Sequence, residues 1–204
     1  MYGDLMSVFD VADWRRSTFD IYRRVRAEPN PALAHALWVA ARREMLLTHP
    51  ASPVAPADRA DPGIGAVAPY DPEYRFVVPP DTDVPESRRD VQTGTDGIVP
   101  FERLGIVHLE GLGTLDVWRL RTYGGGLFVP MRDNTAGTSS YGAGRYVLDT
   151  VKGADLGGDA SALVVDLNFA YNPSCAYDEA WACPLPGSGN RLAADVPVGE
   201  QYIG

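Results

Sequence analysis

Glycine and proline interrupt this chain so often that only its first quarter has room for long helices. The 204 residues include 21 glycines and 17 prolines, which favour turns and short strands. Residues 1–49 hold few of them, with Pro29 and Pro31 as the only prolines. We therefore expect a helical N-terminal arm followed by a body of short strands.

Two helices are predicted within this arm. Side chains at spacings of three and four residues form a first stripe, which runs through Val11, Trp14, Thr18, Ile21 or Tyr22, and Val25. Asn30 followed by Pro31 is a helix start signal, because asparagine caps the first turn and proline suits its first position. A second stripe runs through Leu33, Leu37, Ala40 or Ala41, and Met45. This helix should end near Thr48, before Pro50, and the two helices are expected to pack as a hairpin.

Alternation of apolar and polar residues predicts strands in the rest of the chain. These strands cover residues 104–110, 114–120, 126–132, 144–149 and 163–167. Because no helical period separates them, they indicate an antiparallel meander. Residues 88–93 could add a strand, and a further short strand is expected near residues 194–198.

Together these elements predict an α+β fold that is mainly β. The N-terminal helical hairpin should pack on an antiparallel β-barrel or sandwich, and the chain should form one structural domain. Its parts are a helical arm (1–49), an extended connector (50–72) and a β body (73–204) whose C-terminal loop wraps the sheet.

Charge and motif content exclude several classes of function. The net charge is −9 and no basic stripe is present, so nucleic acid is not an expected partner. No run approaches the roughly 18 apolar residues of a membrane span, and the first residues lack the layout of a secretory signal; a cytosolic location is expected. No phosphate-binding loop, dinucleotide fingerprint or zinc motif occurs, so no cofactor or metal is predicted. The oligomeric state cannot be inferred from these patterns.

The densest group of polar residues lies between residues 131 and 191, near the ends of predicted strands. Alternation could place Arg145 on an inward face, where its guanidinium needs an acidic partner or a ligand anion. Asp133 could supply a structural bridge. Alternatively, Arg145 could anchor an oxyanion while Asp133 or Asp166 acts as its partner or as a base. The other candidate ligand-binding residues are Tyr141, Tyr146, Asp166, Asn168, Tyr171, Asn172 and His108.

Cys175 and Cys183 allow three interpretations. A disulfide is disfavoured in a cytosolic protein, metal ligation would require two further ligands, and two buried thiols packed with aromatic residues would have no chemical role. As a nucleophile, Cys175 would need a base, for which His108 is the plausible histidine. We take Arg145, Asp133 and Cys175 as the candidate catalytic residues.

Several short motifs carry a family resemblance. They are YGAGRY at 141–146, DLN at 166–168, AYNPSCAY at 170–177, CPLP at 183–186 and NRL at 190–192. In this combination the chain resembles a bacterial and archaeal family of unknown function, and most closely its actinobacterial branch. The resemblance covers roughly residues 14–202 and implies no activity.

Two hypotheses about function follow. In the first and preferred one, the β-barrel encloses a pocket for a small anionic or carbonyl-bearing molecule and could perform acid–base chemistry on it. In the second, the protein is a non-catalytic interaction module. That hypothesis predicts an exposed apolar patch on the helical arm around Trp14 or Trp38.

Overall fold

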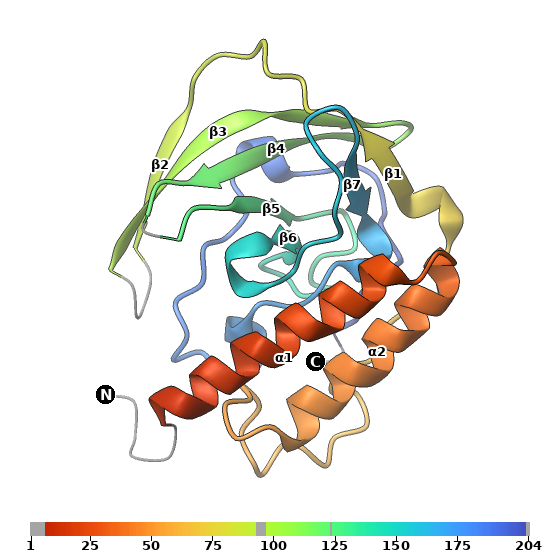
Figure 1. Cartoon of the computed structure of the whole chain (residues 1–204), viewed down its shortest axis with the longest axis vertical. Helices are drawn as coiled ribbons and strands as arrows, with labels where there is room; N and C mark the ends of the chain where they lie inside the picture. Colours follow the sequence, from red (N-terminus) through yellow and green to blue (C-terminus); the bar gives the residue numbers. More distant parts are fainter. Residues whose placement is uncertain (1–6, 93–96, 123, 203–204) are drawn as a thin grey trace.

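The computed structural model describes residues 7–92, 97–122 and 124–202. Two helices, α1 (Val8–Ala27) and α2 (Pro31–Thr48), form the predicted hairpin. A capping box between Ser7 and Asp10 starts α1, and the side chain of Asn30 accepts from the first backbone N–H groups of α2. The predicted start and end of the second helix are thus confirmed. Figure 1 shows both helices on one side of the β body.

The buried face of α2 differs from the predicted one. Leu33 is 59% exposed, whereas Trp38 is 1% exposed. His35 packs with Trp38 against Phe169, and its Nε2 lies 3.0 Å from the backbone oxygen of Asn168. The stacked aromatic rings therefore set the rotation of this helix.

Five strands form an antiparallel sheet in the order β2-β3-β4-β5-β6. Their bounds are β2 (Arg88–Gln92), β3 (Ile98–Leu109), β4 (Gly113–Leu120), β5 (Leu127–Met131) and β6 (Arg145–Asp149). The predicted meander is present, but residues 163–167 were wrongly placed in it. The β2 strand supplies the fifth member instead, and the class, α+β and mainly β, is confirmed.

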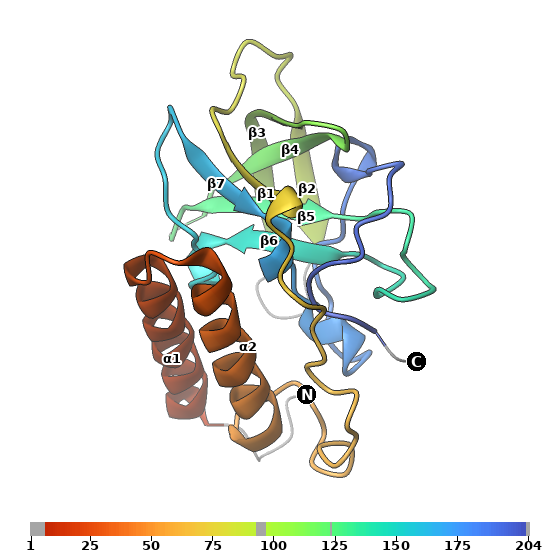
Figure 2. The same cartoon turned by 90° about the vertical axis from the view of Figure 1, so that its right-hand side faces the viewer.

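The remaining two strands form a separate ladder. The β7 strand (Leu163–Asp166) pairs antiparallel with β1 (Arg75–Val78), which follows the connector. In the described part of the chain β2 does not pair with β6, so the main sheet does not close into the predicted barrel. Figure 2 shows the ladder beside the sheet, above the helical hairpin. One large apolar core joins the helices, the main sheet and the ladder.

Hydrogen bonds from a side-chain amide and from the backbone hold the C-terminal segment on the sheet. Asn190 is fully buried. It accepts from the indole of Trp118 and donates to the carbonyl oxygens of Asp116 and Pro130, each at 2.8 Å. The expected strand at 194–198 does not form; this stretch is extended but has no ladder partner. Within the described residues, neither helix combines the length and apolar character that a membrane span requires.

Candidate functional site

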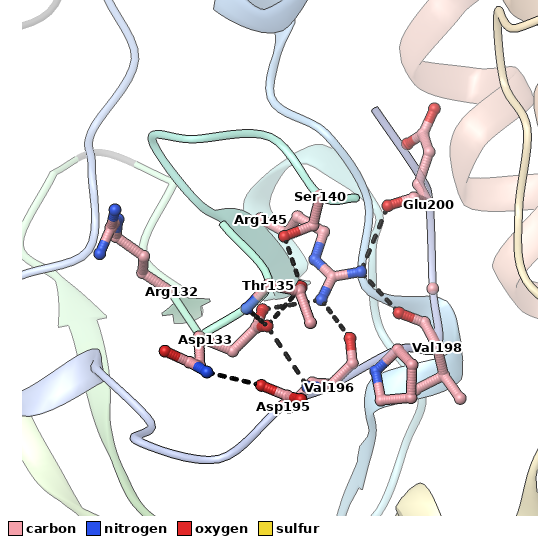
Figure 3. Close-up of polar contacts among 12 residues, drawn as sticks. Arg132, Asp133, Thr135, Ser140, Arg145, Asp195, Val196, Val198 and Glu200 are labelled. Atoms are coloured by element: carbon pink, nitrogen blue, oxygen red, sulfur yellow. Dashed lines mark hydrogen bonds and ion pairs between the residues drawn. The ribbon is translucent and has the colours of Figure 1, made fainter. Parts of the chain in front are cut away.

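Arg145 lies at the start of β6 in a fully closed environment. Gly144 makes the sharp entry to this strand, with φ +102°, and a Cβ there would lie 2.6 Å from the backbone oxygen of Met131. The Arg145 side chain is 0% exposed and donates to Asp133 Oδ2 at 2.8 Å. Its other bonds go to three backbone oxygens of the C-terminal segment, as Figure 3 shows: Val196 at 2.9 Å, Val198 at 2.5 Å and Glu200 at 3.2 Å.

The carboxylate of Asp133 is equally occupied. Its Oδ1 accepts from the backbone N–H and hydroxyl of Thr135, at 2.8 and 2.5 Å, and from the N–H of Val196 at 3.3 Å. Burial lowers the pKa of Arg145, and the charge of Asp133 opposes that effect. The two groups form a structural bridge. Arg145 also donates to the backbone oxygens of Val196 and Val198, which a strand at 194–198 would have used for ladder hydrogen bonds.

Asp166 and Asn168 form a second polar cluster that fastens the connector. Asn168 donates to Asp166 Oδ1 through its backbone and its side chain, at 3.0 and 2.8 Å. Its amide also binds the backbone N–H and carbonyl of Asp71. Burial raises the pKa of Asp166 to about 6, despite the bonds from Asn168 and the charge of Arg75. Asp166 borders a hollow of about 360 Å³ near the end of α1, with Arg26 and Arg75 beside it.

His108 and Tyr141 lie apart from these clusters. Alternation along β3 buries Val107 and Leu109 and turns His108 outward, so that its side chain is 67% exposed and 3.8 Å from Asp81. His108 thus pairs with Asp81 at the surface, and its role as a base for Cys175 stays a prediction without a supporting contact among the described residues. Tyr141 donates to the backbone oxygen of Cys175 at 3.1 Å. The predicted site residues thus divide among several places.

Three of the predicted residues, Tyr146, Tyr171 and Asn172, meet at a cavity of about 90 Å³ between the helices and the sheet. We call it the helix–sheet cavity. Its aromatic lining consists of Trp14, Tyr22, Tyr146, Tyr171 and Tyr177. Its polar lining consists of Thr18, Arg42, Asp149, Lys152, Asn172, Ser174 and Cys183.

Arg42 reaches this cavity from α2. Its guanidinium donates twice to Glu200 Oε2, at 3.0 and 2.7 Å, and lies 4.7 Å from the ring centre of Tyr171. Glu200 is 0% exposed and also accepts from the Tyr177 hydroxyl and the backbone N–H of Asn172. Although burial works against it, the charge of Glu200 raises the pKa of Arg42. The pair holds a charged group rigidly in the cavity wall.

Asp149 enters the cavity from the end of β6. Backbone bonds to Ala154 in both directions close a small loop around the 3-10 helix Thr150–Lys152. Gly153 ends this helix with φ +96° and approaches α1 so closely that a Cβ would lie 3.0 Å from the backbone nitrogen of Phe19. Burial raises the pKa of Asp149 above its ordinary value, although the charge of nearby Lys152 opposes this. A carboxylate whose pKa is raised by desolvation is a candidate proton-transfer group.

Asn172 adds an unused acceptor to the same wall. It is 3% exposed, and its amide nitrogen donates to the backbone oxygen of Gln201 at 3.0 Å. Its Oδ1 is buried without a hydrogen-bond partner among the described residues. Buried acceptors are normally satisfied, so this oxygen is an unused polar atom of a residue that lines the cavity.

Cys183 borders the cavity beside Cys175. Both thiols are free and partly exposed, and the backbone N–H of Cys175 points at Cys183 Sγ with an N···S distance of 3.4 Å. In the parts of the chain that are described, no three histidine, cysteine or acidic side chains gather as metal ligands would.

The sequence interpretation missed Arg42, Asp149 and Glu200. Arg42 follows Trp38 by one helical turn, so the correct phase of α2 would have placed it inward. Asp149 ends a predicted strand whose five residues are all buried. Glu200 carries no sequence signal, because its burial depends on the course of the C-terminal segment.

Comparisons with known proteins identify the family. No functionally curated protein matches the chain. Its fold is similar to the solution NMR structure of an uncharacterised protein from the gene locus rrnAC0354 of Haloarcula marismortui. The two are 29% identical with a TM-score of 0.55, over 80% of this chain and 91% of that one. The family model described as "Protein of unknown function (DUF1684)" matches residues 64–201. This stretch is more than half of the chain, so the chain belongs to that family. The sequence motifs had predicted membership of a family of unknown function.

Proposed function

We propose that the protein binds a small anionic or carbonyl-bearing metabolite in the helix–sheet cavity and performs acid–base chemistry on it. The observation that carries the proposal is the buried carboxylate of Asp149 in the wall of a cavity that also holds Arg42 and the free acceptor of Asn172. Carboxylates whose pKa is raised by burial are one of the groups that transfer protons in active sites.

Each cavity group has a role in this proposal. Asp149 would move the proton. The exposed ammonium of Lys152 at the rim would attract an anionic group, and Arg42, held by Glu200, would supply fixed positive charge. Asn172 Oδ1 would accept a hydrogen bond from a ligand hydroxyl or amine.

The size of the cavity limits the ligand. At roughly 10–15 Å³ per water position, about 90 Å³ corresponds to roughly six to nine water positions. That space suits a small organic acid and excludes a nucleotide. The aromatic walls formed by Tyr171 and Trp14 would cover its apolar part.

The proposal moves the site from the originally favoured residues. Arg145 and Asp133 bind each other and the C-terminal segment, so both terminal guanidinium nitrogens and both carboxylate oxygens are already engaged. The cavity also lies between helices and sheet rather than inside a barrel. A cytosolic location and the actinobacterial branch stay predictions.

The alternative of an interaction module loses half of the support on which it depended. Trp38 is buried against Phe169. Trp14 is only partly buried, packs edge-on against His49 and lines the cavity. Val8, Phe9 and Phe19 on the same helix are exposed, so the interaction module stays the second candidate.

Thermal-shift screening of small carboxylic and carbonyl metabolites tests the proposal. A ligand at a hundred times its Kd stabilises the folded state by about 2.7 kcal/mol. We expect hits that raise the melting temperature of wild type but not of Asp149→Asn or Tyr171→Phe. The matched control is Asp90→Asn, an exposed carboxylate on β2, which should behave as wild type. Hits that stabilise Asp149→Asn as much as wild type would refute this location of the site.

A further inference from the structure

Cys175 and Cys183 are the only cysteines in the sequence, and the fold brings them together. Residues 176–182 connect them as a loop in which Asp178, Glu179, Ala180 and Ala182 are exposed. Both thiols are free and partly accessible, and Cys183 lines the helix–sheet cavity. Small molecules can therefore reach at least one sulfur from the cavity side.

Two tyrosines hold the cysteine loop at its ends. The hydroxyl of Tyr141 donates to the backbone oxygen of Cys175 at 3.1 Å, and the hydroxyl of Tyr146 donates to the backbone oxygen of Pro184 at 2.7 Å. Within this frame the N–H of Cys175 donates to Cys183 Sγ at 3.4 Å. The thiols are also hydrogen-bonded to each other. The pair is thus positioned by the same region of the fold that builds the cavity.

We propose that Cys183 and Cys175 form a thiol–disulfide exchange site for low-molecular-weight disulfides, with Cys183 as the attacking thiolate and Cys175 as the resolving thiol. This activity goes beyond the proposed metabolite binding and does not depend on it. Its substrate is a disulfide R–S–S–R that enters beside Cys183.

The chemistry balances in two steps. The Cys183 thiolate attacks one sulfur of R–S–S–R, the S–S bond breaks, and the first thiolate leaves and takes a proton from water. Cys175 then loses its proton to water and attacks the sulfur of Cys183 in the mixed disulfide. A Cys175–Cys183 disulfide forms and the second thiolate leaves. The two protein thiols are oxidised, and one R–S–S–R is reduced to two R–SH.

The geometry distinguishes the two roles. Only Cys183 receives a backbone N–H bond at sulfur, which stabilises its thiolate. The hydrogen bond from the Cys175 thiol lowers the pKa of Cys183 to about 6 despite partial burial, and the charge of Lys152 and the side chain of Tyr146 act in the same direction. The same hydrogen bond, with burial, raises the pKa of Cys175.

Reaction with dithiodipyridine, whose released thiopyridone absorbs light, tests this assignment. Wild type should release two equivalents per chain and end with a Cys175–Cys183 disulfide, found by peptide mapping. Cys175→Ser should release one equivalent and keep a mixed disulfide on Cys183. Cys183→Ser should react at least about tenfold more slowly, since it lacks the stabilised thiolate.

Two outcomes would overturn the proposal. One is a wild-type product that carries two mixed disulfides, and the other is a Cys183→Ser variant that reacts as fast as wild type. Circular dichroism melting shows whether each variant is folded. If a variant does not fold, labelling of the wild-type protein with a limiting amount of iodoacetamide takes its place. Cys183 should then be labelled before Cys175, and equal labelling of the two cysteines would reject Cys183 as the attacking thiolate.

Discussion

Two arginines, the buried Arg145 and the partly buried Arg42, each bind a buried carboxylate, but their surroundings differ. Arg145 is surrounded by protein on all sides, and its partners are Asp133 and three backbone oxygens. Arg42 binds Glu200 and borders a cavity that also contains Asp149. The guanidinium of Arg145 holds the C-terminal segment in place, and the guanidinium of Arg42 lines the helix–sheet cavity.

The difference shows how a structural arginine can be distinguished from a functional one. Burial and an acidic partner are common to both, so neither criterion separates them. What separates them is the neighbourhood. Arg145 is enclosed by protein, whereas Arg42 borders a cavity that it shares with Asp149, whose pKa is raised. Each region holds one buried polar atom without a partner among the described residues, Arg145 Nε in the first and Asn172 Oδ1 in the second. A carboxylate with a raised pKa in a cavity wall reduces stability and is typical of functional sites.

The largest expected effect is that of Arg145→Ala. Removing this guanidinium leaves Asp133 buried without its partner and frees three backbone oxygens, and breaking a buried pair costs about 3–5 kcal/mol. Urea unfolding followed by circular dichroism measures the loss. Arg88→Ala, at an arginine whose side chain is 64% exposed, is the control and should change stability by less than about 0.5 kcal/mol. A similar small change at Arg145 would contradict its structural role.

Asp166 sharpens the comparison, because it is a buried carboxylate in a fastening role that nevertheless has a pKa of about 6. As the pH rises from about 4 to 6, the unfolded chain loses this proton before the folded chain does, so the group lowers stability by roughly 2–3 kcal/mol. Asp166→Asn removes this dependence. Urea unfolding near pH 4 and pH 7 should show the variant gaining relative to wild type at the higher pH. An unchanged difference would contradict the raised pKa.

Gly153→Ala tests how the loop of Asp149 depends on α1. Alanine at φ +96° costs about 1–2 kcal/mol, and its Cβ would push against the backbone of Phe19. We expect this loss of stability in thermal melting, together with weaker binding of any cavity ligand. Gly137→Ala is a matched control with φ +86° and open space around its Cβ. Equal effects on ligand binding would mean that the contact with α1 does not shape the cavity.

The smallest expected effect has the opposite sign. Asp149→Asn should stabilise the protein at neutral pH by about 1 kcal/mol, or about 2–4 °C in Tm, because an uncharged amide replaces a desolvated carboxylate. The gain should shrink as the pH falls and disappear below about pH 3, where the Asp149 carboxyl is protonated in both states. Asp133→Asn is the comparison and should destabilise at neutral pH, since it leaves Arg145 unpaired. A loss of stability in Asp149→Asn would assign this residue a structural role instead.

Local signals predicted the elements well but not their long-range pairing. Capping by Asn30 and alternation along β3 and β4 are properties of neighbouring residues, so the helices and the hairpin were predictable. The pairing of β7 with β1 joins segments about ninety residues apart, and no local pattern encodes it.

The candidate site was only partly predictable for the same reason. Tyr171 and Asn172 were chosen as ligand-binding residues because polar groups near strand ends often face a ligand, and both line the helix–sheet cavity. Their binding role stays a prediction. Arg145 was chosen because alternation could place it on an inward face, but its bonds to Val196, Val198 and Glu200 depend on the C-terminal segment crossing it. Arg42 and Glu200 meet only after the helices and the C-terminus pack together.

An NMR titration of the labelled protein with the tightest ligand from the metabolite screen tests the central claim most directly. The account predicts amide chemical-shift changes at residues 149–154 and 171–174, which border the helix–sheet cavity. The amide chemical shifts of residues 132–135 and 195–199, around the Arg145 bridge, should not change. Changes concentrated at the bridge, with none at the cavity, would contradict the assignment of Arg145 to structure and of the cavity to binding.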